Sequence, residues 1–224
     1  MRVPLALLVV TLLLAGCAST SPSKDQAPSH ITVGTEAKYP PFEDTVNGAI
    51  VGFDIDLMKE VGKRAGITIT FQNAAFDDII PSVQSGTFDV GASAFTITDA
   101  RKQQVDFSVP YYDNELMVAV ASGTNDVKAE KDITGSDVKV CTQKGTTSHD
   151  WLLQHGHTND SLILLEDFPT CGQAVIRGDA KATMIDRVAV RDLVGKSNGA
   201  LKEAFTITVN EKFGFVVAKG RAAL

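Results

Sequence analysis

The stretch that decides the fold is residues 91–112, which read GASAFTITDARKQQVDFSVPYY. A short apolar strand is expected just before it, at 88–90, and the small residues that follow leave the backbone open to close approach. Thr98 and Asp99 are typical of a helix start, because an oxygen there accepts hydrogen bonds from unpaired backbone N–H groups. Arg101 falls in the first helical turn, where a cation opposes the helix dipole at a cost of about 0.3–1 kcal/mol. An anion bound jointly by the guanidinium and the helix start would offset this cost.

The residues before this stretch alternate between strand and helix patterns. The expected segments are strands at 31–33, 67–71 and 88–90 and helices at 53–65 and 77–85. This order predicts a right-handed, parallel α/β sheet. Ligands bind at the carboxyl ends of the strands in such sheets. The sequence therefore places residues 36–39, Phe76 and residues 93–101 around a binding site.

A second α/β region begins at Val138. Its expected segments are strands at 138–141, 162–165 and 182–185 and helices at 147–153 and 170–177. Gln143-Lys-Gly-Thr-Thr-Ser148 leads into the first of these helices and exposes backbone N–H groups at its start. A phosphate-binding loop is the alternative, but the Gly-x-x-x-x-Gly-Lys spacing is absent. The last strand ends at Asp186.

Two of these charged residues also have ordinary explanations. Arg101 could pair with Asp106 or lie in solvent, as surface charges commonly do. Asp186 could simply cap the helix expected from Arg187 onward. The local sequence around Arg101 and Asp186 does not distinguish these explanations from a role in ligand binding.

The N-terminus has the features of a secretion signal. The apolar run Val3–Leu14 is too short to span a bilayer and is typical of a signal-peptide core. It ends in Leu14-Ala-Gly-Cys17, which matches the lipobox of bacterial lipoproteins, where cleavage leaves a lipid on Cys17; an ordinary signal peptide with a chance cysteine is the alternative. Residues 1–16 are thus predicted to be a lipoprotein signal peptide, and residues 17–30 a flexible tether. We expect an extracytoplasmic protein attached to the membrane by lipid.

Charge and cysteine content narrow the functional class. Without its signal peptide the chain keeps 20 of its 21 basic residues and all 27 acidic ones, a net charge of −7. No basic block is present, so nucleic acid is not expected as a partner. Cys141 and Cys171 suggest one disulfide in an oxidising compartment. The alternative, a metal or redox pair, lacks the Cys-x-x-Cys spacing and nearby ligands, and no metal or cofactor is expected.

The whole stretch 91–112 closely resembles the ligand-carboxylate segment of the periplasmic solute-binding proteins that serve polar amino-acid ABC importers. In that family, the positions of Tyr39 and Phe76 carry aromatics that sandwich the ligand's side chain. The resemblance implies that Arg101 binds the α-carboxylate of an amino acid and that Asp186 binds its α-ammonium group. The remaining positions with implied ligand contacts are Glu36, Ser93, Ala94, Thr96, Gln143 and Thr147.

The resemblance also implies a two-lobed periplasmic-binding-protein (Venus-flytrap) α/β fold, each lobe a mostly parallel sheet flanked by helices. Lobe 1 is expected at 31–118 plus 210–224, and lobe 2 at 119–209. Such a protein is a monomer without cofactor that closes on a free amino acid and docks on the permease subunits of an ABC importer. The cysteine pair is similar to one in glutamate-type binding proteins of actinobacteria.

The C-terminus departs from this family pattern. After residues 215–218 the family continues with a helix that seals lobe 1 and with a further C-terminal helix, whereas this chain ends at Leu224. A truncated reading frame is one explanation. In that case apolar surface on lobe 1 is expected to be exposed and to lower stability.

The side chain of the ligand is predicted from Glu36. A buried carboxylate favours a basic or amide-bearing amino acid and repels glutamate. Two other features favour glutamate instead. One is the cysteine pair, and the other is Lys38 and Lys144, if these lysines point inwards.

The alternative function is enzymatic, because some relatives of this architecture act as cyclohexadienyl dehydratases. The general acid of such an enzyme would be His149 or Glu36. A receptor's sensor domain is disfavoured because no membrane segment follows the lobes.

Overall fold

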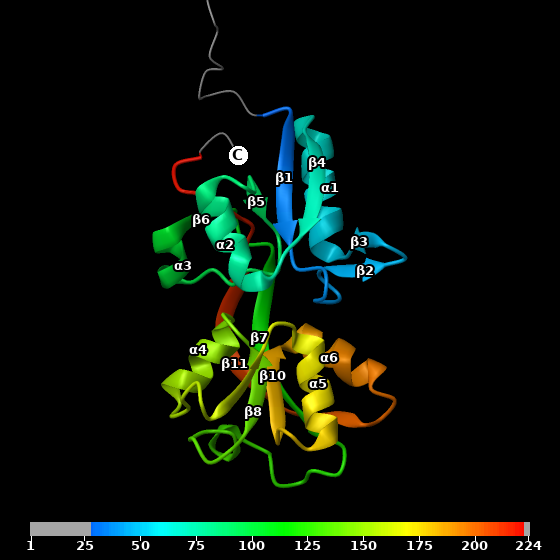
Figure 1. Ribbon diagram of the computed structural model, residues 1–224, viewed down its shortest axis with the longest axis vertical. Coiled ribbons are helices and arrows are strands. Elements are labelled where there is room, and N and C mark those ends of the chain that lie inside the picture. Colours follow the sequence, from blue (N-terminus) through cyan, green and yellow to red (C-terminus); the bar gives the residue numbers. More distant parts are fainter. Residues whose placement is uncertain (1–27, 222–224) are drawn as a thin grey trace, which may run out of the picture.

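The computed structural model describes residues 28–221, which form two lobes joined by two long strands (Figure 1). The predicted signal peptide, the predicted lipid-attachment residue Cys17 and most of the predicted tether lie outside the described residues. Among the described residues, no helix is both long and apolar enough to span a bilayer.

Lobe 1 is built on a five-stranded sheet in the order β4-β1-β5-β12-β6. Only β12 runs against its neighbours, so the sheet is mostly parallel, as predicted. Its strands are β1 (His30–Thr35), β4 (Thr68–Asn73), β5 (Val90–Gly91), β6 (Val105–Phe107) and β12 (Val216–Ala218). Its other elements are the hairpin β2 (Asp44–Val46)–β3 (Ala49–Val51) and the helices α1 (Phe53–Ala65), α2 (Phe76–Ser85) and α3 (Asp99–Gln104).

The two faces of this sheet bury separate apolar clusters. Ile31, Val33 and Val90 pack with Met58 of α1 on one face. Ile79 and Val83 of α2 pack on the other face, together with Val105 and Val216. On the α1 face an apolar groove stays open between that helix and strands β12 and β6, and Val61 and Val109 are exposed there. This groove lies on lobe 1, the lobe on which the sequence analysis expected exposed apolar surface.

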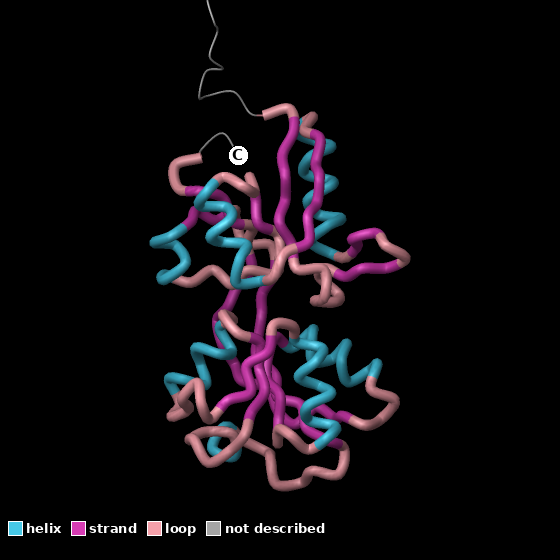
Figure 2. Tube along the Cα trace, in the orientation of Figure 1, coloured by secondary structure: helices cyan, strands magenta, loops and turns pink. Residues whose placement is uncertain are grey.

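Lobe 2 repeats this plan in a sheet of order β11-β7-β10-β8-β9. Only β7 runs against the others. Its strands are β7 (Tyr112–Ala121), β8 (Val140–Gln143), β9 (Leu162–Leu165), β10 (Ala182–Asp186) and β11 (Leu201–Phe213). Its helices are the 3₁₀ turn η1 (Glu130–Asp132) and α4 (Thr147–Gln154), α5 (Phe168–Arg177) and α6 (Arg187–Lys196). Helix α4 covers one face of the sheet, and α5 and α6 cover the other (Figure 2).

The lobes are connected by β7 and β11, which pair antiparallel from Tyr112 opposite Phe213 to Ala121 opposite Leu201. Their register shifts between Ile207 and Glu211. At the lobe 1 end, the rings of Phe42, Tyr112 and Phe213 pack together with centroids 5.2–5.5 Å apart. Both connections are therefore anchored in one aromatic cluster, and the two sheets point their carboxyl strand ends at each other.

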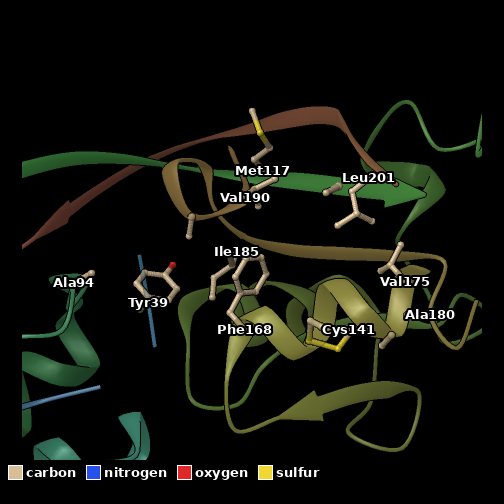
Figure 3. Close-up of a cluster of buried hydrophobic side chains, with 14 of the residues drawn as sticks. Tyr39, Ala94, Met117, Cys141, Phe168, Val175, Ala180, Ile185, Val190 and Leu201 are labelled. Atoms are coloured by element: carbon tan, nitrogen blue, oxygen red, sulfur yellow. A yellow bond between two sulfur atoms is a disulfide. The ribbon is translucent and has the colours of Figure 1, made fainter. Parts of the chain in front are cut away.

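Cys141 and Cys171 form a disulfide that joins β8 to α5. Both residues are fully buried in one apolar cluster, and Figure 3 shows Cys141 and its disulfide near Ala180. The same cluster reaches the space between the lobes, since it also contains Ile185, Phe168 and Tyr39. The disulfide thus ties the strand that ends at Gln143 to the helix that begins beside it.

Candidate amino-acid site

A small cavity lies between the lobes, where β1, β5, β8 and β10 end. It is lined from lobe 1 by Glu36, Tyr39, Phe76, Ser93, Ala94, Thr96 and Arg101, and from lobe 2 by Gln143, Thr146, Thr147 and Asp186. The structure therefore brings all ten sequence-predicted ligand residues to one cavity. Thr146 is the one lining residue that sequence analysis missed; its signal was its place in the hydroxyl-rich turn before α4, which it caps.

Arg101 lies where the helix-start pattern predicted it. The Thr98 side chain caps α3 by accepting from the Arg101 N–H at 3.2 Å. The guanidinium donates to the Thr96 carbonyl at 2.9 Å and across the lobes to the Gly145 carbonyl at 3.0 Å. None of the carboxylates that the structure describes lies within salt-bridge distance of it, so the pairing with Asp106 is wrong; Asp106 pairs with Lys219 instead. Burial lowers the pKa of Arg101, and a bound anion would offset that desolvation.

Asp186 lies on the lobe 2 side of the same cavity, 7 % exposed at the end of β10. Its two oxygens accept hydrogen bonds from the Tyr39 hydroxyl and the Asn114 amide. It occupies the N-cap position of α6 but makes no capping bond, so the helix-cap explanation is wrong. Burial, with repulsion from Glu211, raises the pKa of Asp186 to about 7, while the hydrogen bonds and Arg101 oppose the rise. A cationic ligand group would favour its ionised form.

Glu36 and Gln143 face each other across the lobes. The Gln143 amide nitrogen donates to both Glu36 oxygens, at 2.9 and 2.7 Å, and lies 2.9 Å from the Glu166 carbonyl. Glu36 is only 5 % exposed, and this burial raises its pKa to about 7. A buried carboxyl near its pKa at neutral pH can accept from a cation when ionised or donate to an amide when protonated.

The aromatic residues form one wall of the cavity. The Phe76 ring stacks on Phe95 with centroids 4.8 Å apart, and the Arg101 guanidinium lies 5.5 Å from the Phe76 centroid. Tyr39 packs against Phe168 of the other lobe at 6.4 Å. Figure 3 shows Tyr39 between Ala94 and Ile185. Whether Tyr39 and Phe76 sandwich a ligand's side chain stays a prediction.

Three other residues that were considered from sequence lie outside the cavity lining. Lys38 pairs with Asp167 at 3.4 Å, and Lys144 pairs with Asp77 at 2.8 Å. His149 lies 2.9 Å from the Asn159 side chain. The two lysines therefore bridge the lobes at the rim instead of pointing inwards, and His149 is not placed as a general acid. No group of three or more His, Cys, Asp or Glu in residues 28–221 is arranged to hold a metal ion.

Asn114 and Glu211 support the site from β7 and β11. The Asn114 amide donates to Asp186 and, at 3.0 Å, to Glu211. Burial raises the pKa of Glu211, and hydrogen bonds from Thr147 and Asn114 oppose this. Sequence analysis missed both residues because they lie on the connecting strands, far in sequence from the groups that they contact.

Comparisons with known proteins agree with this geometry. Residues 31–219 match the bacterial extracellular solute-binding proteins, family 3. The L-cystine-binding protein TcyJ of Escherichia coli K12 is 30% identical over 196 residues, 87% of this chain and 73% of TcyJ. The ABC transporter arginine-binding protein 1 of the same organism is 37% identical over 158 residues, 70% of this chain and 63% of that protein.

A solved structure shows the same fold. An ancestral arginine-binding protein bound to arginine superposes with a TM-score of 0.81 at 34% identity, over 87% of each chain. The family match, the relatives and the two-lobed architecture all lead to one assignment. The chain belongs to the bacterial extracellular solute-binding proteins of family 3.

Proposed function

We propose that this protein captures a free amino acid with a basic or amide side chain outside the cytoplasm and delivers it to the permease of an ABC importer. The observation that carries the proposal is the pair Arg101 and Asp186, a cation and a carboxylate from different lobes in one cavity. An α-carboxylate on Arg101 and an α-ammonium group on Asp186 would match the zwitterion charge for charge.

The side-chain preference is inferred from Glu36 and Gln143. Their carboxyl and amide groups are buried in the lining and paired with each other, and the carboxyl oxygens of Glu36 keep lone pairs that a guanidinium, ammonium or amide group could use. An acidic side chain would meet repulsion from Glu36, and the lysines considered as its partners are engaged with aspartates at the rim. We therefore favour arginine, its basic relatives or glutamine over glutamate. The arginine named for two of the similar proteins supports this choice.

Closure of the lobes would couple binding to transport. Contacts that cross the lobes, such as Arg101 to Gly145 and Gln143 to Glu36, form only when the lobes meet. A ligand that bridges Arg101 and Asp186 favours the closed state by its differential affinity, and a permease can recognise that state. We further propose that Cys17 carries the lipid that keeps a monomeric protein at the membrane.

A dehydratase reaction has less support. The relatives compared above are binding proteins, and so is this protein, not an enzyme. Of the two general acids considered, only Glu36 lines the cavity. Incubation with prephenate or arogenate is expected to give no aromatic product.

The test is a calorimetric titration of the protein with the twenty amino acids, ornithine and citrulline. We expect saturable binding of one basic amino acid or glutamine and a rise in the thermal midpoint with the same ligand, since binding stabilises only the folded state. Glutamate binding more tightly than both arginine and glutamine would contradict the role of Glu36. A cooperative melt that none of these ligands shifts would contradict the proposed function.

The pH dependence of binding follows from the raised pKa values of Glu36 and Asp186, each about 7. A cationic side chain requires both carboxylates to be ionised, so below pH 7 each proton that must leave costs about tenfold in affinity per pH unit. Arginine affinity should thus fall up to about 100-fold per unit, whereas glutamine, which can pair with a protonated Glu36, should fall about tenfold. Titrations between pH 5 and 8 measure both slopes. The Glu36→Gln variant should show only the shallower slope, and equal slopes for both ligands in the wild type would refute this assignment.

A further inference from the structure

Two neighbouring residues in the loop between β8 and α4 of lobe 2 contact charged side chains of lobe 1. Lys144 Nζ lies 2.8 Å from Asp77 Oδ2, and the Gly145 carbonyl accepts a hydrogen bond from Arg101 at 3.0 Å. Asp77 belongs to α2 and Arg101 to α3. This loop therefore joins lobe 2 to both helices that border the cavity on lobe 1.

The loop is fixed to its own lobe by hydrogen bonds. The Lys144 N–H donates to the Leu165 carbonyl at 3.0 Å. The Thr146 hydroxyl donates to the Gln143 carbonyl at 2.8 Å, and its oxygen accepts from the His149 N–H as the cap of α4. Because these bonds hold the loop on lobe 2, its contacts with lobe 1 depend on lobe closure.

Gly145 packs on Asp77 so closely that no side chain fits between them. A Cβ at position 145 would overlap with Asp77 Oδ1 and would lie 3.0 Å from Asp77 Cγ. Gly145 also has a φ of +75°, in the left-handed region that favours glycine. The other oxygen of the same carboxylate pairs with Lys144. Asp77 is therefore a seat for two consecutive residues of the loop.

The seated loop holds the guanidinium of Arg101 from the second lobe. Arg101 Nη1 donates to the Thr96 carbonyl of lobe 1 at 2.9 Å, and Nη2 donates to the Gly145 carbonyl of lobe 2. The Phe76 ring lies 5.5 Å from the guanidinium carbon. Two carbonyl acceptors on different nitrogens fix the plane of the group, and a fixed plane favours paired hydrogen bonds to a carboxylate. Without Gly145, Thr96 alone would hold it.

We propose that Gly145 is a positioning residue for ligand binding and that Asp77 is its seat on lobe 1. Closure brings the bare Cα of Gly145 onto the Asp77 carboxylate, and this contact aims the Gly145 carbonyl at Arg101. The guanidinium is thereby oriented for the α-carboxylate of the ligand. Neither Gly145 nor Asp77 lines the cavity. The inference rests on the proposed function, since its effect is on amino-acid affinity.

The test measures affinity for L-arginine and L-glutamine by calorimetry. Gly145→Ala places a Cβ against Asp77 and should lose about tenfold or more, as expected for a lost hydrogen bond to a charged group. Gly145→Asn adds the same atom on a residue that tolerates left-handed backbone better, and it should lose affinity as well. Asp77→Ala removes an exposed ion pair but opens space, so its loss should be about two- to fivefold.

The decisive variant combines the two alanine changes. Gly145→Ala/Asp77→Ala has no carboxylate for the new Cβ to meet, so it should bind within about twofold of Asp77→Ala alone. A residue with only a structural role at position 145 would not be rescued in this way, because distant or independent losses add.

Two single changes are the matched controls. Gly178 has a φ of +81° and no neighbouring atom within 4 Å of an added Cβ among residues 28–221. Gly178→Ala should therefore lower the ligand-free thermal midpoint, as Gly145→Ala does, but leave affinity unchanged. Asp78→Ala removes an exposed acid from the same first turn of α2 and should not change affinity.

A cross-link tests the contact without relying on ligand affinity. Cysteines at positions 77 and 145, introduced as Asp77→Cys/Gly145→Cys, are close enough for a disulfide. Mild oxidation should form this bridge between the lobes, and peptide mapping by mass spectrometry separates it from the bridge between Cys141 and Cys171.

Three results would overturn the inference: wild-type affinity in Gly145→Ala, a double alanine variant that binds no better than Gly145→Ala, or no bridge between positions 77 and 145 with or without ligand. A wild-type protein that binds none of the tested amino acids would count against the proposed function. The cross-link would then still decide whether Gly145 is seated on Asp77.

Discussion

Replacing Arg101 by alanine is expected to lower the affinity for the amino-acid ligand by about 30-fold to several thousand-fold, because removing one partner of a buried charge pair costs about 2–5 kcal/mol. The guanidinium donates to two backbone carbonyls and has no carboxylate partner among the described residues. Its remaining N–H groups are the strongest anion donors in the cavity lining. Without them, none of the side chains that line the cavity would offer the α-carboxylate a permanent positive charge.

Calorimetric titration with L-arginine and L-glutamine measures this loss. Arg64→Ala is the matched control, since Arg64 pairs with Glu60 on the surface of α1 with its side chain 79% exposed; such pairs contribute little. Arg101→Lys should bind better than Arg101→Ala but worse than the wild type, because an ammonium group cannot form the two parallel hydrogen bonds of a guanidinium. An Arg101→Ala protein that keeps wild-type affinity would show that the carboxylate binds elsewhere.

Removing the disulfide is expected to cost about 3–4 kcal/mol of stability, the loss of loop entropy for two cysteines 30 residues apart. Cys141 and Cys171 are completely buried between β8 and α5, so the cross-link acts on the core of lobe 2. In a chain of this size the thermal midpoint should fall by about 10 °C. The measurement is thermal unfolding of the Cys141→Ala/Cys171→Ala variant beside the wild type.

Reduction provides the internal control for this prediction. Dithiothreitol should lower the midpoint of the wild type and leave that of the double alanine variant unchanged. Neither cysteine lines the cavity, so the variant should still bind its ligand at a temperature where it is folded. A variant that melts with the wild type would mean that the disulfide does not form in the protein.

Local sequence patterns predicted the elements that deliver the site. The helix start at Thr98 places Arg101, and the apolar strand before Asp186 ends where predicted. The alternation of strands and helices predicted both sheets, because short connections leave few ways to pack such units. The hairpin of β2 and β3 turns at Asn47 and Gly48. Both residues have positive φ, which is the signature of a two-residue hairpin.

The hydrogen bonds that hold the cavity residues in place could not be predicted from local sequence patterns. Glu43 and Ser93 are 50 residues apart, Asp54 and Ala94 are 40 apart, and Asn114 and Glu211 are 97 apart. Such contacts depend on how the two sheets and their connections pack. An isolated Glu or Asp in the sequence looks like any solvated charge. The family resemblance indicated the residues that line the cavity, but it gave no indication of the buried groups that support them.

The most direct test of the central claim compares L-arginine with agmatine, which has the same guanidinium side chain but lacks the α-carboxylate, in titrations of the wild-type protein. If Arg101 and Asp186 hold the two ends of a zwitterion, agmatine should bind at least about 30-fold more weakly than arginine, as expected for the loss of a buried charge pair. Equal affinity for the two compounds, or binding of agmatine but not of arginine, would contradict the account.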